Sequence, residues 1–400
     1  MTPAHPRFDP SAAPLADPPI QWGRVVIFLG VIFLYWSSMY VYVPILPVYA
    51  RELGASLTIV GLLVGAYGFS QMILRLPLGI FSDRTGQRRI FLSAGFIAAG
   101  LGALGLGLAP TVEWMIVARG IVGVAAATWV TSTVLFTAYF PPRQVARAVG
   151  ILSFSAGMSS LISTTVGGQV AEWVGPQMTF LSGTAIALIG FVLTFFVVEH
   201  RGATRAPPTG AAVVATMTVP TLLLVSITAS LSQYAAWAAT YAFVPIQAAL
   251  LGASRADLGI LTGVSLALQT IAALWIAILG NRVAPRTLIL AGLALMAASI
   301  AVVPAIGDLT LLIVCQAIGG AGRGFAQTSL MSEAVRAVDP ERRATAMGVF
   351  QAVYAVGMFV GPATAGVLGD VLDLGGAFHA SAAIVALGIP LSLAAARLRA

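Results

Sequence analysis

The fold is decided by residues 79–89, GIFSDRTGQRR, a short charged segment between two long apolar ones. Gly79 removes a side chain where a helix must pack closely against its neighbour, and Gly86 permits a positive φ in the turn. Three arginines in so short a loop predict anchoring to lipid phosphates on the cytoplasmic face of a membrane. These arginines are Arg84, Arg88 and Arg89.

The composition of the chain is that of a membrane protein. Of its 400 residues, 58% are hydrophobic and 9% are charged, whereas about a quarter are charged in soluble domains. Each apolar stretch reaches the roughly 20 residues that a bilayer requires, and backbone groups in lipid must pair within a helix. We expect an all-α membrane protein with twelve transmembrane helices. The predicted spans are 25–49, 58–81, 90–109, 112–138, 147–170, 178–198, 219–248, 257–279, 287–306, 309–335, 345–368 and 377–396.

The charges predict the orientation. The chain carries a net charge of +7 and no lysine, and most of its arginines fall in the first tail, the even-numbered turns, the central linker and the carboxyl end. By the positive-inside rule, both termini are cytoplasmic. This distribution indicates membrane lipid as a partner and argues against nucleic acid. The acids predicted to lie on the outer side are Glu52, Glu113, Glu172, Asp257, Asp308, Asp370 and Asp373.

The chain also aligns with itself at an offset of 198 residues. The matched pairs include Pro47 with Pro245, Gln71 with Gln269, and Gly168 with Gly366. Six spans per half make this a parallel repeat, with a cavity where two six-helix bundles meet. The predicted divisions are a disordered cytoplasmic tail (1–22), an N-terminal bundle (23–199), a cytoplasmic linker (200–217) and a C-terminal bundle (218–400).

One helix face leads into the charged loop. Gln71, Arg75, Gly79 and Asp83 recur every four residues and therefore share a face. We expect that face to contact the other half. Asp83, at the helix end, can accept hydrogen bonds from the amino terminus of another helix and interact with its dipole.

The charged loop resembles the G-x-x-x-D-R-x-G-R-R signature, or motif A, of the major facilitator superfamily, with Gln87 in place of a basic residue. Residues 119–123, RGIVG, are similar to that family's R-x-x-x-G motif. Residues 361–366, GPATAG, are similar to the G-P-x-x-G-G element that antiporters carry in helix 5, whereas residues 163–168 in helix 5 itself lack the Gly-Pro pair. Close helix packing is the role expected for Gly361, Pro362 and Gly366.

The resemblance implies a secondary transporter that works by rocker-switch motion, with Asp83 latching the cytoplasmic side. It also implies a monomer in the bacterial inner membrane, with no obligatory protein partner. We expect no cofactor beyond the proton gradient: Cys315 is the single cysteine, and without a lysine no ATP-binding Walker motif exists. No enzymatic activity is expected. The gating residues are Gly79, Asp83, Arg84, Gly86, Arg88 and Arg89.

Three arginines fall within spans, and no span carries a clearly central Asp, Glu or His. A charge inside a membrane is costly, so each is a functional candidate. Arg75 either reaches the cytoplasmic face or pairs between the halves. Arg119 either faces the cavity and binds the solute or reaches toward Glu113. Arg323 either faces the cavity and binds the solute or bonds to nearby backbone carbonyls. Two cations facing the cavity favour an anionic group on the solute.

Aromatic residues share faces in helices 1 and 7, where they either stack on a solute or pack between helices. The predicted cavity residues are Trp36, Tyr40, Gln71, Arg119, Tyr234, Trp237, Tyr241, Gln269 and Arg323. We expect export of a small organic solute by proton antiport, as in the drug and metabolite efflux branch. One alternative is an organic-anion carrier, in either direction, that uses Arg119 and Arg323. Another is a sensor that keeps the fold without transport.

Overall fold

The computed structural model describes residues 20–199, 210–279, 282–339 and 342–398, which include twelve helical segments long and apolar enough to span a membrane. The predicted all-α fold and its twelve spans are therefore confirmed, and these ranges contain no strand. The helices of the first half are α1 (Trp22–Tyr40), α2 (Leu46–Glu52), α3 (Leu57–Thr85), α4 (Arg88–Leu108), α5 (Val112–Ala127), α6 (Trp129–Thr137), η1 (Pro142–Gln144), α7 (Val145–Val174) and α8 (Pro176–Thr194). Those that follow are α9 (Gly210–Met217), α10 (Pro220–Ala236), the π-helix η2 (Trp237–Phe243), α11 (Val244–Leu250), α12 (Arg255–Leu279), α13 (Pro285–Val302), η4 (Val303–Ala305), α14 (Leu309–Arg336), α15 (Arg343–Val371), α16 (Leu374–Ala386) and α17 (Gly388–Arg397).

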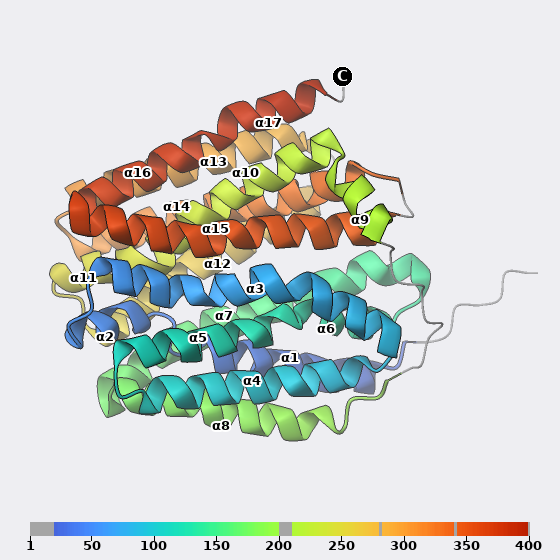
Figure 1. Ribbon diagram of the computed structural model, residues 1–400, viewed down its shortest axis with the longest axis horizontal. Coiled ribbons are helices and arrows are strands. Elements are labelled where there is room, and N and C mark those ends of the chain that lie inside the picture. The colour runs from blue at the N-terminus through green and yellow to red at the C-terminus, as the bar shows by residue number, and fades with distance from the viewer. Residues whose placement is uncertain (1–19, 200–209, 280–281, 340–341, 399–400) are drawn as a thin grey trace, which may run out of the picture.

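The helices form two bundles that lie side by side (Figure 1). At their interface, α3 packs on α15 and α7 packs on α12. We call the end of the molecule that carries α2 and α11 the far end, and the end that carries α9 and the α3–α4 turn the near end. The short helix α9 occupies the last part of the predicted linker. Residues 1–19 of the predicted tail and 200–209 of the linker lie outside the described residues.

The first membrane helix of each half is irregular at the same height. A proline at matching positions contributes to both irregularities, and the first half has a further proline, Pro44, within the irregular segment. Pro47 is the second residue of α2 and Pro245 the second of α11. Proline has no N–H to donate, and its ring clashes with the carbonyl four residues earlier. The preceding turn is accordingly non-helical at residues 41–45 and π-helical at residues 237–243. The sequence analysis matched the two prolines but did not predict the π-helix.

Close backbone contact joins the halves toward the far end. A Cβ added to Gly61 of α3 would collide with the carbonyl oxygen of Pro362 in α15, and one added to Gly366 would collide with that of Leu57. Only glycine allows two backbones to approach this closely. Gly361 lies similarly against the backbone of Tyr234, within its own half.

The contact loosens toward the near end. Among the described residues, a Cβ on Gly79 would meet only Val130 of its own half, at 3.9 Å, and one on Gly150 of α7 would meet nothing within 4 Å. The predicted close approach of a neighbouring helix at Gly79 is therefore wrong for this conformation. Gly86 ends α3 with a φ of 62°, the positive value predicted for the turn.

Candidate functional site

Arg75 joins the two halves midway along α3. Its side chain is 4% exposed. Nη1 donates to the Tyr354 hydroxyl at 2.6 Å, and Nη2 donates to Gln71 Oε1 at 2.6 Å. Because Tyr354 belongs to α15, the pairing between halves is confirmed and the alternative of an arginine reaching the cytoplasmic face is wrong.

Arg119 of α5 lies among aromatic rings. Its side chain is 2% exposed. The guanidinium carbon lies 4.6 Å from the ring centre of Tyr67 and 5.9 Å from that of Tyr42. Its Nε and Nη1 make no hydrogen bond within the described part of the chain. The arginine therefore points toward tyrosines in the interior, and the predicted alternative of a contact with Glu113 is not what the structure shows.

Arg323 of α14 has similar surroundings. It is 4% exposed, and its guanidinium carbon lies 5.2 Å from the ring centre of Tyr241. Nη2 donates to Ser265 Oγ at 3.4 Å, whereas Nε and Nη1 find no acceptor among the described residues. A serine thus takes the place of the predicted backbone carbonyls. Over the described ranges, neither Arg119 nor Arg323 forms an ion pair.

Three aromatic rings, one pair stacked and the other tilted by 41°, connect these two arginines, and we call them the ring array: Tyr67, Trp237 and Tyr241. The centres of Tyr67 and Trp237 lie 5.0 Å apart with an angle of 21° between their planes, and those of Trp237 and Tyr241 lie 4.7 Å apart. Tyr67 comes from α3, and the other two come from the π-helix of the opposite half. The array therefore crosses the interface, with a buried arginine at each end.

The other predicted cavity residues lie outside this array. Trp36 packs on Tyr40 at 5.6 Å and on Trp129 at 5.2 Å, within the first half. The Tyr234 hydroxyl shares a hydrogen bond of 2.7 Å with Thr364. Gln269 Oε1 is buried and has no hydrogen-bond partner in the described ranges. The aromatic residues expected to form one lining are thus divided between a ring cluster and the array.

A small cavity beside Arg323 has a volume of about 10 Å³. It is lined in part by Thr240 and Gln316, which share a hydrogen bond of 3.3 Å. Such a volume holds about one water molecule. An organic solute therefore requires the surrounding helices to separate.

The predicted cavity residues do not include Tyr67, Tyr42 or Tyr354. For Tyr67 a signal was present, because it precedes Gln71 by four residues and Arg75 by eight. The helix face that was recognised from Gln71 onward therefore begins one turn earlier. Tyr354 lies 279 positions from Arg75, and no local pattern indicates that pairing.

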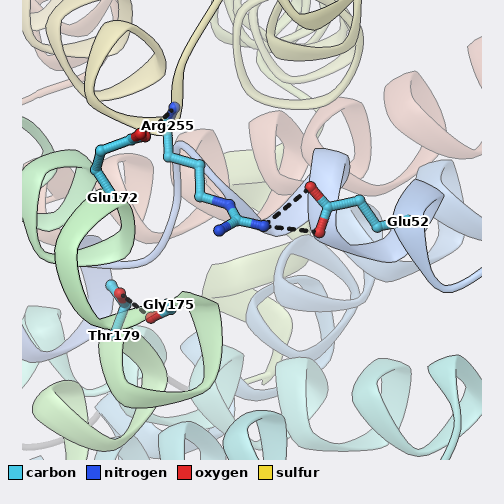
Figure 2. Close-up of polar contacts among 5 residues, drawn as sticks. All are labelled: Glu52, Glu172, Gly175, Thr179 and Arg255. Atoms are coloured by element: carbon cyan, nitrogen blue, oxygen red, sulfur yellow. Dashed lines mark hydrogen bonds and ion pairs between the residues drawn. The ribbon is translucent and has the colours of Figure 1, made fainter.

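Polar contacts hold the far end closed. The backbone N–H of Arg255 donates to Glu172 Oε2 at 2.9 Å, and its guanidinium pairs with Glu52 Oε2 at 3.1 Å (Figure 2). Asp370 of α15 accepts from the backbone N–H groups of Leu57 and Thr58, at 3.0 and 2.8 Å. Each contact crosses between the halves. The meeting of these groups confirms that Glu52, Glu172 and Asp370 share one side of the molecule.

The two backbone contacts are copies of one another, and we call them the far-end clasps: Glu172 with Arg255, and Asp370 with Leu57 and Thr58. Leu57 and Arg255 are 198 residues apart, and so are Glu172 and Asp370. In each clasp, a carboxylate near the end of one helix accepts from the first turn of a helix in the other half. Negative charge is favourable there because the helix dipole is positive at its amino end.

At the near end, the backbone N–H groups of Arg88 and Arg89 donate to the carboxylate of Glu199, which was not among the predicted residues. This bond ties the start of α4 to the end of the first bundle. Arg84 is exposed. The side chain of Asp83 lies outside what the structure describes, so its latch role stays a prediction.

The arrangement of two matched bundles around a buried polar centre agrees with a comparison of the sequence. The family model of the Major Facilitator Superfamily matches residues 28–246 and 225–399. The chain belongs to the major facilitator superfamily. As a superfamily member, it is an integral membrane transporter.

Similar proteins within the superfamily have low sequence identity to this chain. The uncharacterized MFS-type transporter MJ1560 of Methanocaldococcus jannaschii is 21% identical over 357 residues, covering 85% of this chain and 89% of the relative. The multi-drug resistance efflux pump PmrA of Streptococcus pneumoniae is 26% identical, over 42% of this chain and 43% of the pump. A bacterial homologue of the lysosomal transporter Spinster, solved in an inward-facing, unoccupied conformation, superposes with a TM-score of 0.80 and 15% identity, covering 96% and 98%. The last comparison shows the shared fold alone.

Proposed function

We propose that this superfamily member moves a small organic solute by alternating access, rocking its two bundles about the buried centre. The observation that carries the proposal is the uneven interface. Backbone lies against backbone at Gly61, whereas a Cβ added to Gly79 on the same helix face would meet no described atom of the other half within 4 Å. An interface tight at one end and loose at the other is what one state of a rocking transporter requires.

The direction we propose is export, coupled to proton entry. PmrA supports export through its function as an efflux pump, over the part of the chain that matches. The antiporter-like element at residues 361–366 supports proton exchange. With the near end cytoplasmic, as the arginines predict, this conformation is closed to the outside. One chain supplies both bundles, so we propose a monomer in a bacterial inner membrane.

We expect transport to follow a proton gradient. In proteoliposomes with an acidic lumen and outward-oriented cytoplasmic faces, labelled solute should accumulate inside, because protons leave as solute enters. Solute uptake is measured with and without nigericin, which collapses the gradient. Accumulation that survives nigericin would contradict proton exchange. Equal uptake in protein-free liposomes would favour the alternative of a sensor that keeps the fold without transport.

We also expect Asp83→Asn to abolish transport while leaving expression intact. The carboxylate is proposed to hold the near end shut through a helix dipole, and that interaction needs its charge. The measurement is solute flux per purified molecule in liposomes. Asp308→Asn serves as a control, because Asp308 accepts from the N–H of Leu311 on its own helix. Normal flux in Asp83→Asn would remove the latch role.

A further inference from the structure

We propose that the solute is a flat organic anion with two negative groups, bound by Arg119 and Arg323 with its body in the ring array. This inference rests on the proposed transport function. It adds to that function the charge and the shape of the solute.

The charge follows from the two arginines. A guanidinium stays ionised in a protein interior, and these two are 2% and 4% exposed. Tyrosine faces offset only part of the cost of burying a cation. Throughout the described ranges neither arginine has an acidic partner. The centre therefore attracts anions and repels cations.

The free hydrogen-bond donors of the arginines also indicate an anionic solute. Arg119 and Arg323 each keep two buried nitrogens, Nε and Nη1, without an acceptor among the described residues. Carboxylates and phosphates carry oxygens that match such donors. Arg75 shows the contrast, because both of its terminal nitrogens bind acceptors supplied by the protein. The Nε of Arg75 also lacks an acceptor, so what distinguishes Arg119 and Arg323 in the described ranges is a free terminal nitrogen, Nη1, beside the free Nε.

The number of negative groups follows from the placement of one free arginine in each half. Arg119 belongs to the first half and Arg323 to the second. A solute with one negative group can satisfy one of them, whereas a dianion joins the halves across the interface. Such a solute binds best when both bundles approach it, and this difference in affinity can drive a conformational change.

The shape follows from the ring array. Tyr67 and Trp237 stack at 5.0 Å but belong to different halves, so their contact must part when the bundles rock. The exposed π-faces then suit a planar body. The cavity present here, about 10 Å³, is too small for such a body. Separation of these two rings is therefore the step that admits the solute.

Isothermal titration calorimetry on the full chain in detergent tests this with matched probes. The probes are 1,4-benzenedicarboxylate, benzoate, benzamide, phenyltrimethylammonium and sulfate. We expect the dicarboxylate to bind at least tenfold more tightly than benzoate or sulfate, and the neutral and cationic probes not to bind. Failure of the dicarboxylate to bind would overturn the proposal. Equal binding by sulfate would overturn the role of the rings, and tighter binding by the cation would overturn that of the arginines.

Charge-removing variants then locate the site. Arg119→Gln and Arg323→Gln should each weaken dicarboxylate binding by about 10- to 100-fold, since a hydrogen bond to a charged group is lost. Each should also remove the preference over benzoate. Arg147→Gln is the control and should change binding less than threefold, because Arg147 is exposed and contacts Gln144 and Trp22 rather than the ring array. Unchanged binding in both cavity variants would contradict the assignment. Arg323→Lys, which keeps the charge, should lie between Arg323→Gln and the wild type.

The outcome for the solute is separable from the outcome for transport. Proton-driven flux of a neutral or cationic solute, with no anion binding, would remove this inference and leave the transport proposal standing. Tight dicarboxylate binding without flux of any probe would keep the binding site and overturn the transport proposal.

Discussion

Gly61→Val is expected to hold the far end open and to abolish transport. The added Cβ would collide with the backbone carbonyl of Pro362, and a backbone carbonyl cannot rotate away. Overpacking of this kind costs about 1–3 kcal/mol, which lowers the share of the far-end-closed state by about 5- to 150-fold. A cycle that cannot close the far end cannot move solute.

The measurement is the distance between spin labels on Leu53→Cys and Leu250→Cys, in a background with Cys315→Ala. Both positions are exposed, at 48% and 73%, and they lie at the ends of α2 and α11. We expect a longer distance in Gly61→Val. Gly30→Val is the matched control, because a Cβ there meets nothing within 4 Å. An unchanged distance with normal flux in Gly61→Val would refute the role of this contact.

Removing both far-end clasps should open the far end in two equal, independent steps. Glu172→Ala and Asp370→Ala each remove a carboxylate that caps a helix in the other half. For exposed caps we expect about 0.5–1 kcal/mol each. The double variant should therefore shift the equilibrium by about 5- to 30-fold. The effects should add, because each carboxylate acts on a different helix.

The same label distance reports this shift. Asp308→Ala is the control, because Asp308 caps its own helix by accepting from the N–H of Leu311, a contact within one half. High salt should open the wild type toward the state of the double variant, since exposed charges are screened. A distance distribution in the double variant identical to that of Asp308→Ala would show that the clasps do not hold the far end.

Much of the fold followed from local rules, because lipid allows few backbone arrangements. Twelve apolar stretches became twelve spans, and Gly86 took the positive φ that its turn requires. The offset of 198 residues, found from glycines and prolines, also relates both far-end clasps. Because the two halves repeat, a contact between distant residues has a counterpart at the positions 198 residues away. The sequence of a single helix does not reveal such a relation.

The candidate site was only partly predictable. Burial of Arg119 and Arg323 followed from the cost of charge in a membrane, but their partners did not. Tyr67 and Trp237 are 170 positions apart in the sequence and belong to different bundles. Their stacking therefore depends on how the two bundles dock. The close helix contact predicted at Gly79 is absent for a different reason. A sequence motif has to suit every conformation of a protein that moves, whereas the structure shows one conformation.

The prolines that break the first helix of each half have a consequence for motion. A segment in which the α-helical hydrogen-bond ladder is interrupted, as at a proline or a π-helical turn, is where a helix bends most readily. Residues 41–45 and 237–243 are such segments, and the pieces beyond them, α2 and α11, contact each other. Each of these two short helices is therefore connected to its bundle through an irregular segment. We therefore expect these two irregular segments to take up part of the motion proposed for the far end.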